Sequence, residues 1–329
     1  MQRLALSAVT LLGVGIVVFV LLRVAPGDPV SMMISPSATP ADVAALRAHY
    51  GLDRPLATQF GLWLFAALRL DFGDSISLRR HVLELLGERF PATLELAFAA
   101  FAFGALGGGL VAVAGTLARG SALEAALDFV NGLFLAVPDF VWAMTLVLLI
   151  GVAFPILPLS GRIDPAFASD FVTPFYLIES AVRWNGAALR DLLAHMAMPA
   201  LALGLPLAAV IARTLKEALS EAMVQDYILL ARLKGKSELR LVLQEALRNA
   251  LGPTLSLTGV QLTFMIGGTV IVERIFAYPG VGALAIDAVV NRDLPLIQGV
   301  ALAFGALFIL INLTVDLATA RLDPRQAHG

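Results

Sequence analysis

Six stretches of about 20 mostly apolar residues dominate this chain of 329 residues. A helix rises about 1.5 Å per residue, so each stretch is long enough to cross the hydrocarbon part of a bilayer. Composition agrees, because 59% of the residues are hydrophobic and only 15% are charged, whereas soluble domains are about one quarter charged. The chain is therefore predicted to be an all-α integral membrane protein with about six transmembrane helices, at residues 4–22, 93–117, 129–154, 193–212, 254–272 and 296–318.

The remaining composition excludes several classes of function. The chain has no cysteine, which excludes disulfides, Cys-ligated metal sites and thiol catalysis. A net charge of −2 gives no reason to expect a nucleic-acid partner. No small-residue cleavage site follows the first apolar stretch, so that stretch is predicted to be a retained span rather than a signal peptide.

The distribution of Lys and Arg predicts the orientation in the membrane. Six spans put both termini on one side, and short cytoplasmic loops are enriched in Lys and Arg. The loops after spans one, three and five hold 12 such residues, against 11 on the other side. The first loop, at about 70 residues, is long enough to escape the rule. Setting aside its 7 leaves 5 against 11, which predicts cytoplasmic termini and a cytoplasmic segment 213–253.

Segment 213–253 is the longest polar interruption in the C-terminal half, and its pattern predicts two short helices. Asp226 is placed to cap the first, and Gly235 to end it after a basic last turn. Ser237 is placed to cap the second, which Gly252-Pro253 would end. A helix with one apolar stripe lies on a membrane surface or docks a partner. The stripe of this second helix is Leu239, Val242, Leu243, Ala246, Leu247, Ala250 and Leu251.

The first loop carries helix signals of its own. Thr39-Pro40 predicts a helix to Tyr50, and Pro55 starts another. The expected organisation is therefore a first span at 1–22 and a small helical extracytoplasmic insertion at 23–92. A core of five spans follows at 93–325, with the cytoplasmic loop 213–253 inside it, and 326–329 form a tail.

No motif for catalysis or nucleotide binding is present. The sequence contains no Walker A, HExxH, EF-hand or GxSxG pattern. The glycine-rich residues 104–110 lie inside an apolar stretch, which favours a helix-packing face over a phosphate site. The four histidines are far apart in sequence, so no metal site is predicted. The chain itself has no visible means of hydrolysing ATP.

A few polar groups fall at or near membrane depth, where such residues suggest function. Asp139 either faces a water-filled path or makes an interhelical hydrogen bond, and the sequence leaves both open. Glu273 lies close to a span end, where solvation at the interface is the simpler interpretation. With Asn312 of the sixth span, these residues are the candidates for a translocation pathway.

Eight motifs in order give the chain a family resemblance over almost its whole length. It resembles the inner-membrane permease subunits of ABC importers, in the dipeptide, oligopeptide and nickel branch. This resemblance implies the type I importer permease fold. The matching residues are 26–30, 50–60, 89–97, 157–162, 198–213, 273–282, 291–299 and 312–325.

Segment 226–235 is similar to the EAA loop of that family, in which Glu-Ala-Ala is followed three residues later by Gly. Only Ala231 and Gly235 keep this pattern, and the Glu is absent. The peptide branch typically has a looser form there, which Asp226, Tyr227, Ala231, Arg232, Lys234 and Gly235 reproduce. By resemblance, this short helix is the coupling helix that docks on the cytoplasmic ATPase.

The resemblance also implies partners. A second homologous permease, two ATPase subunits that hold ATP and Mg, and an extracytoplasmic binding protein would complete the importer, so this chain would bind no cofactor. Peptides are the favoured substrate, with nickel or another small solute as the alternative. An ion-driven carrier that works alone is disfavoured, because no inverted repeat is visible and only Asp139 is a suitable acid.

Overall fold

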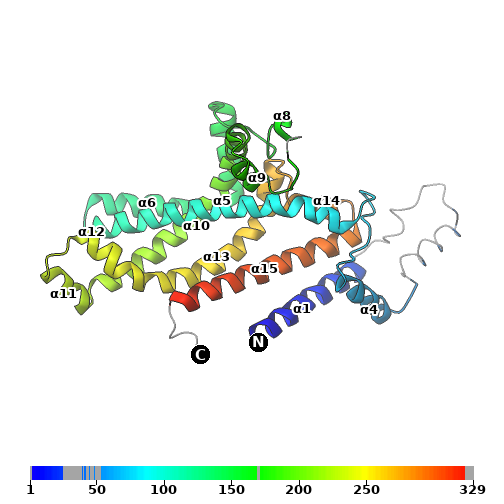
Figure 1. Cartoon of the computed structure of the whole chain (residues 1–329), viewed down its shortest axis with the longest axis horizontal. Coiled ribbons are helices and arrows are strands. Elements are labelled where there is room, and N and C mark those ends of the chain that lie inside the picture. The colour runs from blue at the N-terminus through cyan, green and yellow to red at the C-terminus, as the bar shows by residue number, and fades with distance from the viewer. Residues whose placement is uncertain are drawn as a thin grey trace. The chain divides into compact units, whose positions relative to one another are not determined.

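The computed structural model describes residues 2–24, 53–168 and 171–322, together with residues 39, 41, 44 and 48. In this part of the chain the regular elements are helices, and the β pairing is an isolated bridge between Asp74 and His81. The chain forms two compact units (Figure 1). Unit 1 comprises Met1–Pro91 and Gly280–Ile309, and unit 2 comprises Ala92–Pro279 and Leu310–Gly329.

Unit 1 holds α1 (Gln2–Val24), α4 (Leu56–Ala67), α14 (Val281–Val290) and the first turns of α5 (Val82–Leu117) and α15 (Leu294–Leu322). The predicted helix after Pro55 is confirmed by α4, whereas the one expected before Tyr50 lies outside the described residues. The core of unit 1 consists of Val82, Leu85, Leu86, Val281, Leu284, Ala288, Leu296 and Val300.

A buried carboxylate fixes the start of α15 within unit 1. Asp293 is fully buried, and its Oδ1 accepts the backbone N–H of Leu296 at 3.2 Å. Its Oδ2 accepts the hydroxyls of Ser75 at 2.6 Å and Ser77 at 2.8 Å. A buried ionised group is tolerated when it is hydrogen-bonded in this way. The loop before α5 is therefore tied to the N-terminus of α15.

Unit 2 is built around one long helix, α10 (Gly186–Met223), which contacts α6, α7, α9, η2 and α13. Its apolar side chains are mostly buried, and its core cluster includes Met196, Met198, Leu203 and Leu207. A helix that is apolar on most sides belongs in the interior of a helical assembly. The other elements of unit 2 are α6 (Ala122–Ala136), α7 (Asp139–Leu146), η1 (Val147–Ala153), α8 (Pro165–Ala168), α9 (Tyr176–Val182), α11 (Asp226–Leu233), α12 (Glu238–Arg240), η2 (Leu241–Ala246) and α13 (Leu247–Ile275).

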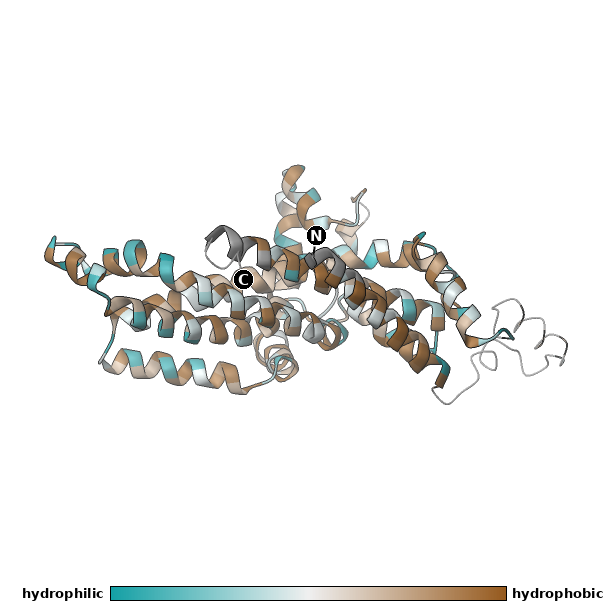
Figure 2. Cartoon of the chain, turned by 90° about the horizontal axis from the view of Figure 1, so that it is seen from below, coloured by the Kyte–Doolittle hydropathy of each residue, from teal (hydrophilic) through white to brown (hydrophobic). Residues whose placement is uncertain are grey.

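All six predicted apolar stretches lie in helices, which are largely coloured as hydrophobic in Figure 2. Four helical stretches are long and apolar enough to cross a membrane: α5, α10, Glu238–Ile275 and Leu294–Val315. The bent pair of α6 and the helix Asp139–Ala153 gives a fifth if its two halves are counted as one span. The first predicted stretch lies in α1, a helix of 23 residues. The prediction of an all-α membrane protein is confirmed.

The third span is not the continuous helix that was expected. Its two halves meet at an angle of 101° at Pro138, which precedes α7. Proline disfavours helical backbone in the residue before it, and Val137 is extended here. The sequence contained this signal, but the long apolar run on both sides masked it.

The non-helical part of segment 213–253 is shorter than the sequence predicted. Helix α10 continues through Arg213 to Met223, and Gly252-Pro253 lies inside α13 rather than ending a helix. Proline is tolerated within membrane helices when neighbouring groups satisfy the freed carbonyl. The true break in the chain is confined to the residues around α11.

Two glycines of α5 let it approach α10 closely, as the packing interpretation predicted. A Cβ atom at Gly108 would lie 2.5 Å from the backbone oxygen of Ala208, and one at Gly104 would lie 2.8 Å from Leu207. On the other helix, a Cβ atom at Gly204 would lie 2.9 Å from the Ala100 carbonyl. Small residues at such contacts allow van der Waals packing between backbones, which holds membrane helices together.

We predict that Gly108→Ala destabilises the protein by about 1–3 kcal/mol, because the new methyl group meets backbone that cannot move aside. Gly109→Ala is the matched control, since nothing lies within 4 Å of a Cβ atom there. Thermal unfolding of the purified protein in detergent measures the difference. Equal melting temperatures for the two variants would contradict this account of the contact.

Candidate functional site

Helix α11 is a short rod with a well-defined end. Its N-cap residue is Gln225, so Asp226 is the first helical residue rather than the predicted cap. At this position the positive end of the helix dipole stabilises its carboxylate. Gly235 has a φ of +82°, the left-handed conformation that glycine adopts without strain. The N–H of Lys236 bonds the Ala231 carbonyl and that of Gly235 bonds Arg232, which is the Schellman arrangement.

One face of α11 is anchored in the core of unit 2. Ile228 is 0% exposed and Ala231 is buried beside it. Helix α10 contributes Leu215, Leu219 and Ala222 to the same cluster, and the helix that follows contributes Leu241, Val242, Ala246 and Ala250. Helix α11 therefore packs directly against both of these long helices.

Polar contacts brace the same segment. Arg232 donates to both carboxylate oxygens of Glu238, at 2.8 and 3.0 Å. This pairing raises the pKa of Arg232, chiefly through the hydrogen bond to Glu238. Lys236 forms an ion pair with Glu245, and Asn249 donates to the Tyr227 hydroxyl at 2.8 Å. Exposed ion pairs contribute only about 0–1 kcal/mol each, so they select an orientation more than they stabilise the fold.

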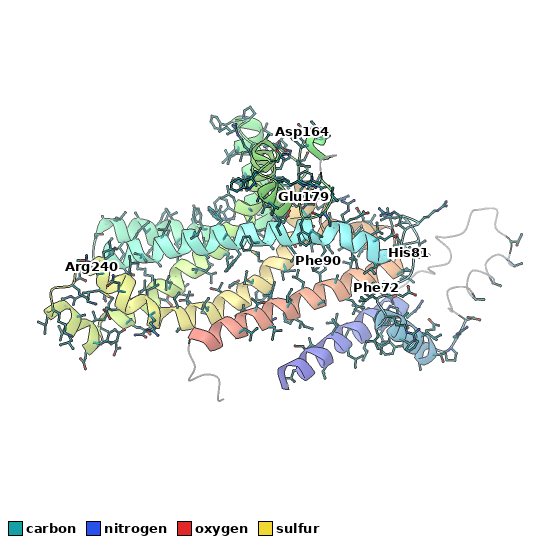
Figure 3. The ribbon with its side chains drawn as sticks, viewed as in Figure 1. Phe72, His81, Phe90, Asp164, Glu179 and Arg240 are labelled. Carbon is teal, nitrogen blue, oxygen red and sulfur yellow. The ribbon has the colours of Figure 1, made fainter. Side chains whose placement is uncertain are left out.

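The opposite face of α11 is exposed and apolar. Leu229, Leu230 and Leu233 are 54%, 55% and 78% exposed, and Asp226 and Lys234 lie on the surface near them. Large exposed leucines rimmed by charges are typical of a protein-docking surface. The α11 end of unit 2 is visible in Figure 1, and Arg240 of α12 is labelled near it in Figure 3.

The predicted apolar stripe of the second helix is divided between two environments. Val242 is fully buried and Leu247 packs against the same cluster, whereas Leu239 and Leu243 are exposed. The physical reason is that Leu241–Ala246 is a π-helical turn, in which a period of 3.6 residues no longer describes the face. Leu241, which the stripe omitted, is buried instead.

The three pathway candidates lie on three different helices. Asp139 is the first residue of α7, and its Oδ2 would be 2.0 Å from a Cβ atom at Gly268. Its carboxylate therefore rests on the backbone of α13. Glu273 is fully buried and accepts the Thr93 hydroxyl at 2.7 Å, so interfacial solvation does not describe it. Asn312 is partly buried on α15.

The buried ion pair between Arg162 and Glu95 was not predicted from the sequence. Arg162 and Glu95 are each 5% exposed, and Nη2 of Arg162 lies 2.6 Å from Oε2 of Glu95. Arg162 also donates to the Pro174 carbonyl at 2.8 Å, and its guanidinium lies 4.0 Å from the Tyr176 ring centroid. Oε1 of Glu95 accepts the N–H of Leu177 at 2.8 Å. Both residues lie in family motifs, but a separation of 67 residues gives no local signal of pairing.

Glu179 organises the segment that precedes α10, where Figure 3 labels it together with Asp164. Its carboxylate accepts the Thr173 hydroxyl and the backbone N–H groups of Val172 and Thr173, at 2.5–2.9 Å. These bonds, with that of the Thr173 hydroxyl the strongest, lower the pKa of Glu179 to about 2. Among the residues that the structure describes, no group of three His, Asp or Glu could hold a metal ion.

Comparison with known proteins decides the family. Residues 104–328 match the family described as "Binding-protein-dependent transport system inner membrane component", and residues 1–97 match the N-terminal family of the same membrane components. The chain belongs to this family.

Full-length relatives are similar in sequence. The chain is 36% identical over 328 residues to the di/tripeptide transport system permease protein DppB of Pseudomonas aeruginosa, covering 99% of this chain and 98% of the relative. It is 35% identical to the dipeptide transport system permease protein DppB of Escherichia coli K12, covering 100% and 98%.

A solved structure shares the fold. In an inward-facing structure of the MetNI methionine ABC transporter, one chain matches with a TM-score of 0.55 and 17% identity, over 73% of this chain and 97% of that one. At this identity the match shows the fold alone. The family match and the long apolar helices together make the chain a multi-pass inner-membrane permease component of an ABC importer. As the membrane subunit rather than the ATPase, it works with a binding protein and an ATPase.

We predict that the segment around Glu179 loosens in acid. The pKa of Glu179 falls from its ordinary 4.5 to about 2 in the folded protein. Its contribution to stability is therefore complete above about pH 4.5 and is lost as the pH falls toward 2. Trp184, which is 92% exposed and nearby, reports this change. Its fluorescence, with Trp63 and Trp142 replaced by Phe, should change across that window.

The Glu179→Gln variant is the control for this titration, because its amide cannot gain a proton in that range. Its Trp184 fluorescence should lack the transition between pH 4.5 and 2. An identical transition in both proteins would contradict the assignment.

Proposed function

We propose that this chain is a peptide-conducting permease subunit, which moves di- or oligopeptides across the cytoplasmic membrane by alternating access. The observation that carries this proposal is the 35–36% identity, over essentially full length, to two permeases named for di- and tripeptide transport. Nickel or another small solute remains the alternative substrate within the same kind of system. The binding protein would carry most of the substrate specificity.

Helix α11 is proposed to be the coupling helix. Its inner face is fixed by Ile228 and Ala231, and its outer face presents Leu229, Leu230 and Leu233 to a partner. The residues Asp226, Tyr227, Arg232, Lys234 and Gly235 shape and brace it. When the ATPase subunits close, a helix held in this way moves as a rigid body and displaces α10 and α13 with it. The absent EAA glutamate removes one polar contact but leaves this mechanical role intact.

The complete importer is proposed to contain a second homologous permease as a heterodimeric partner, two ATPase subunits that bind ATP and Mg, and one binding protein. Both termini and α11 are proposed to be cytoplasmic. The Lys and Arg distribution supports this orientation. The length of α10 is compatible with it, because 38 residues extend about 57 Å and carry the chain beyond the membrane. The segment before α10 would then lie outside.

Asp139 is the proposed pathway residue with the best structural support. It sits at the 101° break between two apolar helices, α6 and α7. Interrupted helices in transporters are tolerated where they line a cavity or are buried in protein. Asn312 remains a second candidate. The burial of Glu273 favours a role in a buried polar network instead.

Peptide uptake by the reconstituted complex tests the substrate. Proteoliposomes that contain the permeases, the ATPases and the binding protein should accumulate a labelled dipeptide with ATP inside, and excess unlabelled dipeptide should abolish the signal. Accumulation of nickel without peptide uptake would establish the alternative. Gradient-driven uptake by this chain alone would contradict the whole assignment.

We predict that Leu233→Asp lowers ATP-driven uptake at least about tenfold, the effect of losing ~1.4 kcal/mol of docking free energy. Leu233 is 78% exposed on α11, so the substitution should leave the fold intact. Gly235→Pro should also abolish coupling, because proline cannot adopt a φ of +82°. Co-purification of the ATPase with the permease measures docking directly.

The matched control is Val182→Asp, at an exposed apolar residue of α9, far along the chain from α11. It should keep the ATPase bound. Normal uptake and ATPase binding by both α11 variants would refute the coupling role.

A further inference from the structure

Three separate parts of unit 2 converge on one buried polar cluster. Thr93 and Glu95 come from α5, and Arg162 comes from the segment before α8. Glu273 lies near the end of α13, and Tyr278 follows that helix by three residues. The Thr93 hydroxyl donates to Glu273 at 2.7 Å, which joins α5 to α13. The ion pair between Arg162 and Glu95 joins the segment to α5.

A backbone hydrogen bond completes this junction. The N–H of Gly161 donates to the Phe276 carbonyl at 2.9 Å, so the residue next to Arg162 is attached to the end of α13. Arg162 therefore bonds α5 through its side chain, while the backbone beside it is bonded to the end of α13. Each of these two helices supplies one buried carboxylate, Glu95 and Glu273.

A contribution to the stability of the fold does not by itself explain why these charged residues are buried. Replacing a buried ion pair by apolar residues of the same size is often neutral or stabilising, and ionisable groups buried in membrane proteins are costly and functional. The best-attested role of charged groups in a protein interior is to favour one conformation over another.

The hydrogen bonding of the cluster is also incomplete. Among the described residues, the buried Nε of Arg162 has no hydrogen-bond partner. Arg162, Glu95 and Glu273 all act electrostatically on Tyr278, whose pKa burial raises. A buried donor without a partner destabilises the arrangement that leaves it unpaired. The present arrangement therefore does not satisfy the network fully, and a nearby second arrangement can compete with it.

We propose that Arg162 is a positioning residue for transport, which exchanges between the carboxylates of Glu95 and Glu273 as the permease changes state. Paired with Glu95, as seen here, it holds residues 171–177 on α5 through the Pro174 carbonyl and the Leu177 N–H. Paired with Glu273, it would hold the same segment on the end of α13. The two pairings define two discrete positions for the segment that precedes α10.

The long helices connect this exchange to the energy source. Glu273 lies near the C-terminal end of the continuous helix Glu238–Ile275, and the opposite end of that helix packs against α11. A displacement of α11 thus reaches Glu273 through a rod of 38 residues. This step rests on the proposed coupling of α11 to an ATPase, whereas the two pairings themselves are a property of the permease alone.

Two isosteric substitutions test the exchange in the assembled complex. Glu95→Gln weakens the pairing seen here, and Glu273→Gln weakens the alternative. Spin labels at Phe98→Cys on α5 and Ile178→Cys on α9 report the position of the segment, since both side chains are exposed and the chain has no other cysteine. Pulsed electron paramagnetic resonance then gives the distance distribution without nucleotide and with trapped ATP.

The expected result is opposite shifts. In nucleotide-free complex, Glu95→Gln should move the ratio of the two distance populations about tenfold toward the ATP-trapped distribution, because a hydrogen bond to a charged group has this effect on an equilibrium. Glu273→Gln should hold the nucleotide-free distribution even with ATP. A change in the same direction, or no change, in two folded variants would overturn the exchange and leave Arg162–Glu95 a structural pair.

Two further readouts separate the possible failures. Arg162→Lys keeps the positive charge and should retain both populations, whereas Arg162→Met should lose the ATP response while remaining assembled. If ATP does not move the labels in the unsubstituted protein, the proposed coupling fails. The nucleotide-free comparison of Glu95→Gln with Glu273→Gln still decides the exchange in that case.

Discussion

The burial of α10 is the constraint on which unit 2 depends. Lipid offers no hydrogen bonds and no gain in apolar burial between helices, so membrane helices associate by close packing and a few polar contacts. Helix α10 meets this requirement along its length, since α6, α7, α9 and α13 all pack against it. Its neighbours can approach because Gly204 and Gly108 remove side-chain bulk at the contact with α5. The elements that carry function are attached to this central helix.

The two ends of α10 have different chemistry. At its C-terminal end, apolar burial of Ile228 and Ala231 fixes α11, and the polar contacts there are exposed. Before its N-terminal end, the segment is held by buried charge, through Glu179 and the Arg162–Glu95 pair. Apolar contacts are insensitive to small rotations, whereas hydrogen-bonded charges have strict geometry. The first end is suited to transmit force, and the second to distinguish conformations.

The sequence was sufficient for what depends on local composition. The six apolar stretches, the stop at Gly235 and the packing role of the glycines follow from hydropathy, backbone conformation and side-chain size. It was insufficient where residues distant in the chain meet. Nothing near Arg162 in sequence indicates its pairing with Glu95, and Glu273 looked solvated because its burial depends on Thr93 of another helix. The π turn at Leu241–Ala246 changed the helix face without any local signal.

The contact between Gly108 and Ala208 has a mechanical consequence. Two helices separated by side chains can slide, because rotamers adjust as one surface passes the other. Here a Cβ atom at Gly108 would meet the Ala208 carbonyl and the Ile211 side chain, so the backbones of α5 and α10 lie close together. Axial sliding at this point would bring side chains of one helix against the backbone of the other, which close packing disfavours. Movement of α5 relative to α10 is therefore restricted at the position of Gly108.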